Sequence, residues 1–360
     1  MVYIDPEFEV PGIPEDEQYE GTEIDANILK ALPDGAEVQW VATYGASAWA
    51  VSSKVDVKLP DGREQSYFSK VYTAGIADAI ARGEYEATKA LYEMIPQNVP
   101  KPVGWGPCAG NSQRAFFIAE FRNMTDEMPG VDELAALTAK IHQKHSPNGK
   151  FGFDVMTFSG KHGSDNNWCD TWEEFFTRAM EDTMDGERKV HGPNEELDAL
   201  SPIILRKVIP RLIRPMETEG RSITPVLLHG DYWHGNVSVD NETNEAILYD
   251  PCSFYDDFGM WRASRYRTNR AHVRAYFKIA GMSEPVEDQD DRHALYALRN
   301  DLSTSICWPG NKRMRDLAIV EMKRLVEKYK DGYEGYQAAK GRQVDENNWA
   351  TDMARRPMAA

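Results

Sequence analysis

The sequence predicts an α+β protein with two lobes, a small N-terminal lobe rich in β-strands and a larger, mainly helical C-terminal lobe. The chain has 360 residues, more than a single hydrophobic core usually serves, so two packing units are expected. Residues 37–71 alternate apolar and polar side chains, as half-buried strands do. Beyond Asn123 the apolar residues recur at helical spacing instead. The boundary between the lobes is therefore expected near residue 122.

The expected N-terminal lobe consists of an antiparallel meander, one helix and a final strand. Apolar and polar residues alternate from Val55 to Leu59, and a Pro-Asp-Gly turn follows at 60–62. Residues 81–95 carry apolar side chains at mostly helical spacing and are followed by proline. Residues 114–121, RAFFIAEF, are too continuously apolar for a strand with a solvent face. They predict a buried strand that leads into the second lobe.

The rest of the chain has mainly helical periodicity. Helices are expected at 131–142, 171–180, 195–216, about 290–307 and 313–329. A strand, a turn and a second strand are expected within 236–250. The chain then divides into an N-terminal extension (1–36), an N-lobe (37–122), a C-lobe (123–331) and a polar C-terminal tail (332–360) that is expected to fray.

Composition limits the classes of partner. The net charge is −17, which argues against a general binder of nucleic acid or of anionic membranes. No apolar run is long enough for a membrane span, and the N-terminus lacks the basic and apolar regions of a signal peptide. The four cysteines are widely spaced and form no CxxC pair. We expect a soluble cytoplasmic protein with no nucleic-acid or membrane partner. The sequence does not set its oligomeric state, and a monomer is favoured.

Residues 227–250, LLHGDYWHGNVSVDNETNEAILYD, place acids and an amide at the edges of apolar runs. Asp231 and Asn236 lie five positions apart, and a hairpin then ends at Asp250. This order matches phosphoryl transfer in the kinase fold, where an Asp accepts a proton from the attacking hydroxyl while an Asn and a second Asp hold magnesium. Each residue alone is more simply a turn, strand-start or loop residue. Together, after a β-rich half, they favour the kinase interpretation.

The segment HGDYWHGN resembles the signature of the fructosamine kinases, or ketosamine 3-kinases, a branch of the protein-kinase-like and aminoglycoside-phosphotransferase-like group. Further segments resemble the family in the expected order: GEYEATKAL, VPKPVGWG, GKFGF, DNNWCDTWEEFF, PVLLHGD and YDPCSFY. The likeness runs from about residue 38 to 330 and is closest to fungal members. It implies an ATP- and Mg²⁺-dependent kinase of the 3-hydroxyl of a sugar-derived ketosamine, on a glycated protein or a small amine. The phosphorylated adduct then decomposes, which reverses glycation.

The resemblance also implies roles for individual residues. Asp231 is similar to the catalytic base of the family, in a loop oriented by His229. Asn236 and Asp250 are similar to its magnesium ligands.

The nucleotide-binding residues are implied in the same way. Lys70 resembles the lysine that pairs with the ATP phosphates, and Glu84 resembles the helix carboxylate that holds it, with Glu86 as the alternative. The hinge that receives adenine would be Glu120-Phe121-Arg122. In the phosphate-covering loop, TYGASAW supplies only Gly45.

Two tryptophans resemble residues of the family's substrate cleft. Trp233 follows the base by two positions, and an aromatic face suits the C–H face of a sugar. Trp168 lies in the DNNW segment. For both, the alternative is a packing role, Trp233 under the loop and Trp168 in the helical lobe.

The chain departs from the family after DPCSFY, where relatives carry a His-x-Glu segment before a bracing acid. This chain reads YDDFGMWRAS and is about four residues shorter, so Asp256 or Asp257 would have to brace the catalytic loop. Two alternatives therefore stay open. One is a small-molecule kinase of the same fold that acts on an aminoglycoside, choline or another hydroxylated amine. The other is a nucleotide-binding homologue with impaired catalysis.

Overall fold

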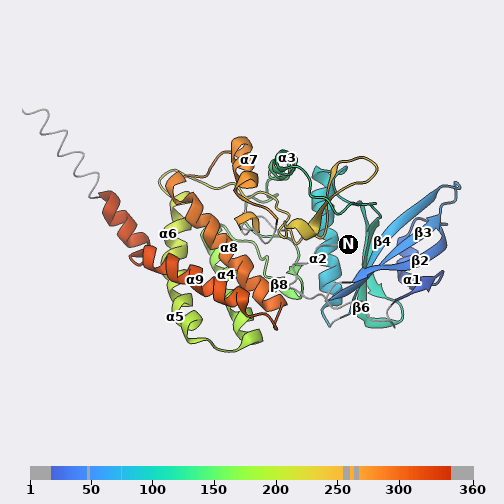
Figure 1. Ribbon diagram of the computed structural model, residues 1–360, viewed down its shortest axis with the longest axis horizontal. Coiled ribbons are helices and arrows are strands. Elements are labelled where there is room, and N and C mark those ends of the chain that lie inside the picture. Colours follow the sequence, from blue (N-terminus) through green and yellow to red (C-terminus); the bar gives the residue numbers. More distant parts are fainter. Residues whose placement is uncertain (1–17, 47–48, 74, 254–259, 263–266, 342–360) are drawn as a thin grey trace, which may run out of the picture.

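The computed structural model describes residues 18–46, 49–73, 75–253, 260–262 and 267–341. Figure 1 shows two lobes, with a β-sheet at one end of the molecule and a group of helices at the other. The expectation of a small β-rich lobe followed by a larger helical lobe is confirmed.

The N-terminal lobe is built on a six-stranded sheet in the order β1-β2-β3-β4-β6-β5. Its strands are β1 (Glu20–Gly21), β2 (Glu37–Ala46), β3 (Ala50–Lys58), β4 (Glu64–Thr73), β5 (Pro102–Cys108) and β6 (Asn111–Glu120). Each hydrogen-bonded pair of neighbouring strands is antiparallel. The meander expected from the alternating pattern is therefore present, and the sheet also takes in residues 20–21, within the segment expected to be an extension.

Helices cover both faces of this sheet. The helix α1 (Ala26–Ala31) packs through Ile28 against one face, in a cluster with Val55 and Ile118. The longer helix α2 (Ala77–Met94) packs through Ile80 and Ala81 against the other face. Side chains point alternately to the two faces of a strand. In β4, Lys70 accordingly lies on the side of α2, which in Figure 1 stands between the sheet and the helical lobe.

The C-terminal lobe consists of helices around two clusters of buried side chains. Its helices are α3 (Val131–Ile141), α4 (Trp172–His191), α5 (Glu195–Ile203), α6 (Ile209–Ile213), α7 (Arg270–Ala280), α8 (Gln289–Cys307) and α9 (Arg313–Lys328). Two small hairpins accompany them, β7 (Thr157–Ser159) with β8 (His162–Ser164), and β9 (Val237–Val239) with β10 (Ala246–Leu248).

The expected helix at 195–216 is interrupted. Between α5 and α6, residues 204–208 form a π-helical turn, and residues 214–216 form a 3₁₀ turn. Pro202 lies inside α5 and Pro210 inside α6. A proline has no backbone N–H to donate and its ring crowds the preceding turn, so regular α-helical bonding cannot run through this segment.

The first ten residues of the C-terminal tail differ from the expectation that it frays, and residues 342–360 lie outside the described part of the chain. Residues 332–341 are helical. The guanidinium of Arg211 lies 4.1 Å from the ring centroid of Tyr336, and Lys340 pairs with Glu219 at 2.6 Å. The polar composition of this segment predicted fraying, because composition alone does not reveal contacts with residues far away in the chain.

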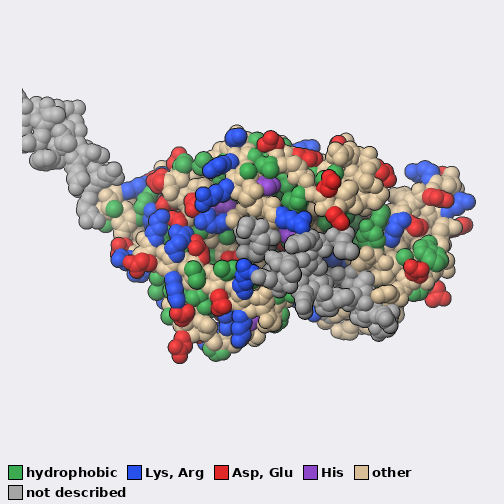
Figure 2. Space-filling view, in the orientation of Figure 1, with side chains coloured by type: hydrophobic (Ala, Val, Ile, Leu, Met, Phe, Trp, Pro, Cys, Tyr) green, Lys and Arg blue, Asp and Glu red, His purple; other side chains and the backbone are tan. Residues whose placement is uncertain are grey.

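No helix in the described part of the chain is long and apolar enough to cross a membrane. Figure 2 shows basic and acidic side chains interspersed over the helical lobe on this face. The net charge of −17 is therefore not spread as one uniform negative surface here.

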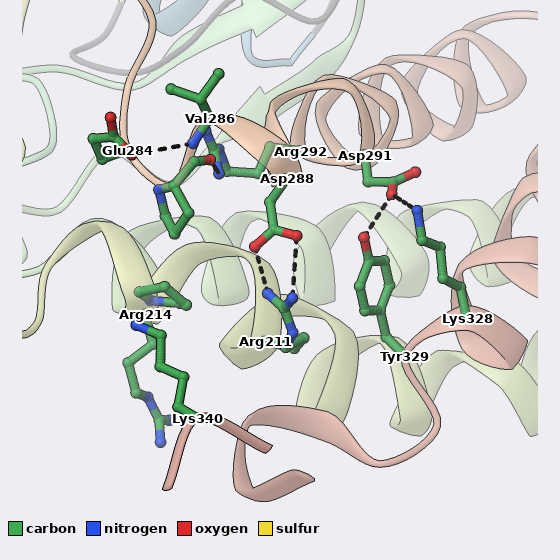
Figure 3. A network of polar contacts seen from close by, with 12 residues as sticks. Arg211, Arg214, Glu284, Val286, Asp288, Asp291, Arg292, Lys328, Tyr329 and Lys340 are labelled. Atoms are coloured by element: carbon green, nitrogen blue, oxygen red, sulfur yellow. Dashed lines mark hydrogen bonds and ion pairs between the residues drawn. The ribbon is translucent and has the colours of Figure 1, made fainter. Parts of the chain in front are cut away.

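A polar network joins α6, α8 and the end of α9 (Figure 3). The two terminal guanidinium nitrogens of Arg211, Nη1 and Nη2, donate to the carboxylate of Asp288 at 2.6 and 3.1 Å. Asp291 accepts hydrogen bonds from the Tyr329 hydroxyl and the Lys328 ammonium group. Both acids are buried. Because a buried carboxylate is costly unless it is paired, the network fixes these helices relative to one another.

Replacing Asp291 with Asn should lower the free energy of unfolding by about 2–4 kcal/mol, because buried hydrogen bonds lose an ionised acceptor. Burial raises the pKa of Asp291, but hydrogen bonds from Lys328, Tyr329 and Arg324 outweigh it and lower the pKa from 3.8 to about 2. The ionised carboxylate therefore contributes stability above pH 3.8, and that contribution is lost as the pH falls towards 2. Urea unfolding at pH 7 and at pH 3 should show a smaller difference between wild type and variant at pH 3.

Lys323→Ala provides a matched control on α9, the helix that supplies Lys328 to the buried network. Its ion pair with Glu196 is at the surface, with both side chains more than half exposed. Its loss should change the unfolding free energy by less than about 1 kcal/mol. Equal losses for Asp291→Asn and Lys323→Ala would contradict a structural role for the buried network.

Candidate active site

The site expected from the sequence forms where the two lobes meet. Lys70 comes from β4 and Glu84 from α2, both in the N-terminal lobe. Asp250 follows β10 in the C-terminal lobe. The Lys70 ammonium lies 2.7 Å from Asp250 Oδ1 and 3.3 Å from Glu84 Oε1. The structure therefore brings together three charged residues that are up to 180 positions apart in the chain.

Lys70 and Glu84 are buried, whereas 45% of the Asp250 side chain is exposed. Burial alone would lower the pKa of Lys70, but the charges of Asp250 and Glu84 outweigh it and raise the pKa. Burial raises the pKa of Glu84, and the charge of Lys70 opposes the rise. Lys70 is thus held as a cation. Glu84, and not Glu86, is its partner from α2.

The short hairpin β9–β10 explains why Asp250 lies close to Asn236. Its antiparallel register pairs Val237 with Leu248, and the Tyr249 N–H donates to the Asn236 carbonyl at 3.1 Å. Asn236 and Asp250 therefore lie at the same end of the hairpin. The Asn236 side-chain amide donates to the Asp250 carbonyl at 3.3 Å, which closes this end.

Asp231 is held by the same amide. Asn236 Nδ2 donates to the Asp231 carbonyl at 2.9 Å and to its carboxylate at 2.8 Å. Burial and the nearby charge of Asp250 raise the pKa of Asp231 to about 7. Hydrogen bonds from the side chains of Asn236 and Trp233 act in the opposite direction. A carboxylate with a pKa near neutrality suits a general base.

His229 connects the loop that carries Asp231 to the segment around Asp250. Its Nε2 lies 3.0 Å from the Tyr249 carbonyl, and its own carbonyl accepts the Cys252 N–H at 3.0 Å. Burial lowers the pKa of His229 to about 4, so the ring is neutral at pH 7 and Nε2–H can donate to Tyr249. His229 is therefore a positioning residue for Asp231.

Gly230 is required by the backbone of this loop. Its φ is +81°, and a Cβ at this position would lie 2.2 Å from the Cys252 carbonyl oxygen. An L-residue would be strained and would collide with the segment that follows Asp250.

Trp233 makes a contact that the sequence did not indicate. Its side chain hydrogen-bonds the Asp231 carboxylate, and this bond lowers the pKa of Asp231. Its ring also packs against His234, with centroids 4.8 Å apart. Trp233 is half-buried beside the base. Trp168 is half-buried as well and packs against a core cluster of the C-terminal lobe that includes Tyr232.

The residues present fit a magnesium ion that is shared with nucleotide phosphates. Among the residues described, no group of three or more His, Cys, Asp or Glu side chains could hold a metal ion. Magnesium at such sites uses only one or two protein ligands together with phosphates and water. Asp250 offers a half-exposed carboxylate, and the hydrogen bonds of Asn236 Nδ2 orient the amide so that its carbonyl oxygen is available as a ligand. Asp250 also has φ +54°, a strained conformation that is common at functional sites.

In the expected hinge, Glu120-Phe121-Arg122, two backbone N–H groups already donate hydrogen bonds within the protein. The Glu120 N–H donates to the Lys101 carbonyl and the Phe121 N–H to the Ser66 carbonyl. Arg122 is held through its side chain, which donates to the Gln97 carbonyl at 3.3 Å. An adenine ring would therefore need a donor other than the N–H of Glu120 or Phe121.

Two aromatic residues near the hinge were not identified from the sequence. The Tyr44 ring meets the Phe121 ring edge-on, with centroids 5.0 Å apart. Tyr44 also lies close enough to Tyr249 to contribute to raising that residue's pKa. Neither tyrosine has a sequence signal apart from its position, directly before Gly45 and Asp250 respectively.

Gly45 lies near the end of β2, where a Cβ would have no neighbour within 4 Å. Ser47, in the same loop, lies outside the described residues, as do Asp256 and Asp257, the candidates for bracing the catalytic loop.

Gly230→Ala should lower the free energy of unfolding by about 2–4 kcal/mol, because the added Cβ meets backbone at a positive φ. Gly45→Ala is the matched control, since nothing opposes its Cβ, and should change stability by less than about 1 kcal/mol. Urea unfolding of both variants measures the difference. A Gly230→Ala protein as stable as wild type would show that the loop does not need this conformation.

Comparisons with known proteins agree with this geometry. The fructosamine kinase family model matches residues 48–339. The chain is 30% identical over 246 residues to a chloroplastic protein-ribulosamine 3-kinase of Arabidopsis thaliana, covering 65% of this chain and 70% of the relative. It is 29% identical over 212 residues to a ketosamine-3-kinase of Mus musculus, covering 52% of this chain and 65% of the relative.

Solved structures show the same fold. A Thermobifida fusca protein described as a fructosamine-3-kinase superposes with a TM-score of 0.66 at 19% identity, covering 85% of this chain and 99% of the other. An aminoglycoside phosphotransferase superposes with a TM-score of 0.52 at 15% identity, covering 81% and 95%. The fold is therefore protein-kinase-like. With the family model matching most of its length, the chain belongs to the fructosamine kinase family.

Proposed function

We propose that this protein is an ATP-dependent ketosamine 3-kinase. The observation that carries the proposal is the convergence of Lys70, Asp231, Asn236 and Asp250 on one hydrogen-bonded site between the lobes. Relatives named protein-ribulosamine 3-kinase and ketosamine-3-kinase support the acceptor class. The acceptor would be a ribulosamine or fructosamine on a glycated protein or small amine, and phosphorylation of its 3-hydroxyl would promote deglycation.

The chain's own residues account for the proton transfer. Asp231 accepts the proton of the acceptor hydroxyl as the hydroxyl oxygen bonds to the γ-phosphorus and the bond from phosphorus to the bridging oxygen of ADP breaks. Asn236 and Trp233 hold the Asp231 carboxylate in place through hydrogen bonds. Positioning of the two reactants supplies most of the rate acceleration in this kind of transfer.

Lys70, fixed by Glu84, would neutralise phosphate oxygens of ATP. The strand end near Gly45 would cover the phosphates, and residues 120–122 would line the adenine site. An aminoglycoside phosphotransferase of the same fold has been solved in a complex with AMP-PNP and hygromycin B, which supports nucleotide binding by this fold. Asn236 and Asp250 would hold Mg²⁺, which when bound screens the negative charge of the phosphates.

Trp233 and Trp168 stay candidates for the acceptor pocket. Trp233 is the stronger of the two because it is half-buried and contacts the base. We also expect the protein to act in the cytoplasm, since its four cysteines are free thiols, as a reducing compartment favours.

Asp231→Asn should reduce ADP release with fructosyl-lysine or ribulosyl-lysine by at least about a hundredfold, because the amide cannot accept the proton. Thermal stabilisation by Mg-ATP should persist in the variant, since the phosphate-binding residues are unchanged. An unchanged rate would sink the assignment of the base. Faster turnover of aminoglycosides or choline than of ketosamines by wild type would favour the small-molecule alternative.

The pH dependence should identify Asp231 as the base. Activity requires its ionised form, so kcat/KM should rise with pH through about 7 in the wild type. Trp233→Phe removes a hydrogen bond that lowers the pKa of Asp231, so the midpoint should move up by about half to one pH unit. His229 would not produce this limb, because its pKa is about 4.

The matched control is Trp40→Phe, since Trp40 is 45% exposed on β2. Its pH profile should coincide with that of wild type. If Trp233→Phe also coincides with wild type, the hydrogen bond to Asp231 does not control the reaction.

A further inference from the structure

Two tryptophans from different lobes meet near the proposed active site. Trp49 directly precedes β3 in the N-terminal lobe, and Trp308 caps the C-terminal end of α8. Their ring centroids are 6.0 Å apart and the rings are inclined by 62°. Trp49 lies four residues after Gly45, at the strand end proposed to cover the ATP phosphates. The contact therefore joins this part of the N-terminal lobe to the helical lobe.

The hairpin β7–β8 supports this pair. Gly160 lies at its turn with φ +59°, and a Cβ there would lie 2.9 Å from Cys307 Sγ and 3.1 Å from the Trp49 ring. The Cys307 thiol contacts the Ser159 carbonyl at 3.3 Å. The hairpin turn is thus pressed between the N-lobe tryptophan and the end of α8, and only glycine fits there.

The hairpin is anchored to both lobes. Phe158 packs with the N-lobe cluster that contains Tyr72 and Phe117. On the other side, the Thr157 hydroxyl donates to the Cys252 carbonyl at 3.4 Å. In Figure 1 β8 accordingly lies between the helical lobe and α2. A hairpin that is held by contacts on two sides can position nearby side chains reproducibly.

This support lies beside the proposed base. Cys252 hydrogen-bonds the His229 carbonyl, at the start of the catalytic loop. Cys307, next to Trp308, lies close enough to Asp231 for the negative charge of Asp231 to add to the effect of burial in raising the thiol pKa. The tryptophan pair is therefore linked, through Cys307 and the β7–β8 hairpin, to the Cys252 segment that hydrogen-bonds the loop of Asp231.

We propose that Trp49 and Trp308, supported by Gly160, form a wall of the acceptor site that binds the C–H face of the ketosamine sugar. Both tryptophans are half-buried, so neither is enclosed in a core cluster. Aromatic faces bind C–H surfaces of sugars without requiring charge. Because Trp49 belongs to the N-terminal lobe, the wall is complete only when the lobes are in contact. The proposal rests on the proposed function and adds determinants of its specificity.

The test compares steady-state constants of Trp308→Ala, Trp49→Ala and the double variant with a ketosamine acceptor. Trp308→Ala should raise the acceptor KM at least fivefold and leave the KM of ATP within twofold. The double variant should show less than the product of the two single effects, because each variant already breaks the same wall. Trp308→Phe should restore most of the acceptor affinity. Trp40→Ala, on the exposed part of β2, should match wild type.

Two outcomes would overturn the proposal. The first is an acceptor KM within twofold of wild type in both single variants. The second is an ATP KM of Trp308→Ala that rises as much as its acceptor KM, which would indicate a general loss of structure. The Asp231→Asn protein gives an independent readout, since its thermal stabilisation by ketosamine should disappear when Trp308→Ala is added. If the wild type phosphorylates ketosamines and both single variants keep its acceptor KM, only the aromatic wall is disproved. If the wild type does not phosphorylate ketosamines, the proposed function is disproved as well.

Discussion

A single buried ammonium group holds the proposed active site together. The Lys70 side chain is only 9% exposed and lies within 3.3 Å of two carboxylates. An unpaired charge at a buried position would be costly, so the two carboxylates are needed to stabilise the folded protein as well as for the proposed chemistry. One partner, Glu84, comes from the same lobe and the other, Asp250, from the opposite lobe. Lys70 therefore links the two lobes through a buried ion pair.

The same interaction extends to the proposed base. Asp250 accepts the Asn236 amide on its carbonyl oxygen, and that amide also holds the Asp231 carboxylate. A short chain of polar contacts thus runs from the proposed phosphate-binding lysine to the proposed base. Groups connected in this way respond as a unit, so removing one member changes the environment of the others. This explains why the pKa of Asp231 depends on both Asp250 and Lys70.

Much of this site could be predicted from the sequence, because several of its residues stand at recognisable positions next to apolar runs. Asp231, Asn236 and Asp250 lie at the ends of apolar runs, and antiparallel pairing of β9 with β10 is the simplest way to join those runs. The contact between Gly230 and the Cys252 carbonyl could not be predicted, because it joins segments whose separation in space the sequence does not state.

The same limit applies to the fold. The meander and most helices follow from periodicity, whereas β7 and β8 have only three residues each and carry no periodic pattern. The helix at 332–341 was missed because its stability comes from contacts such as that of Tyr336 with Arg211, far away in the chain. Periodicity predicts elements that bury a continuous face, and these segments are held by individual long-range contacts instead.

Three different kinds of contact join the lobes near the site. Lys70 and Asp250 form an ion pair, Phe158 packs into an N-lobe cluster, and Trp49 touches Trp308. Magnesium bound at Asp250 would compete with Lys70 for the same carboxylate, but it would leave the apolar and aromatic contacts intact. Motion between lobes is the usual expectation when their interface is small and polar. Here the β7–β8 hairpin supplies an apolar connection between the lobes that does not depend on the ion pair of Lys70 with Asp250.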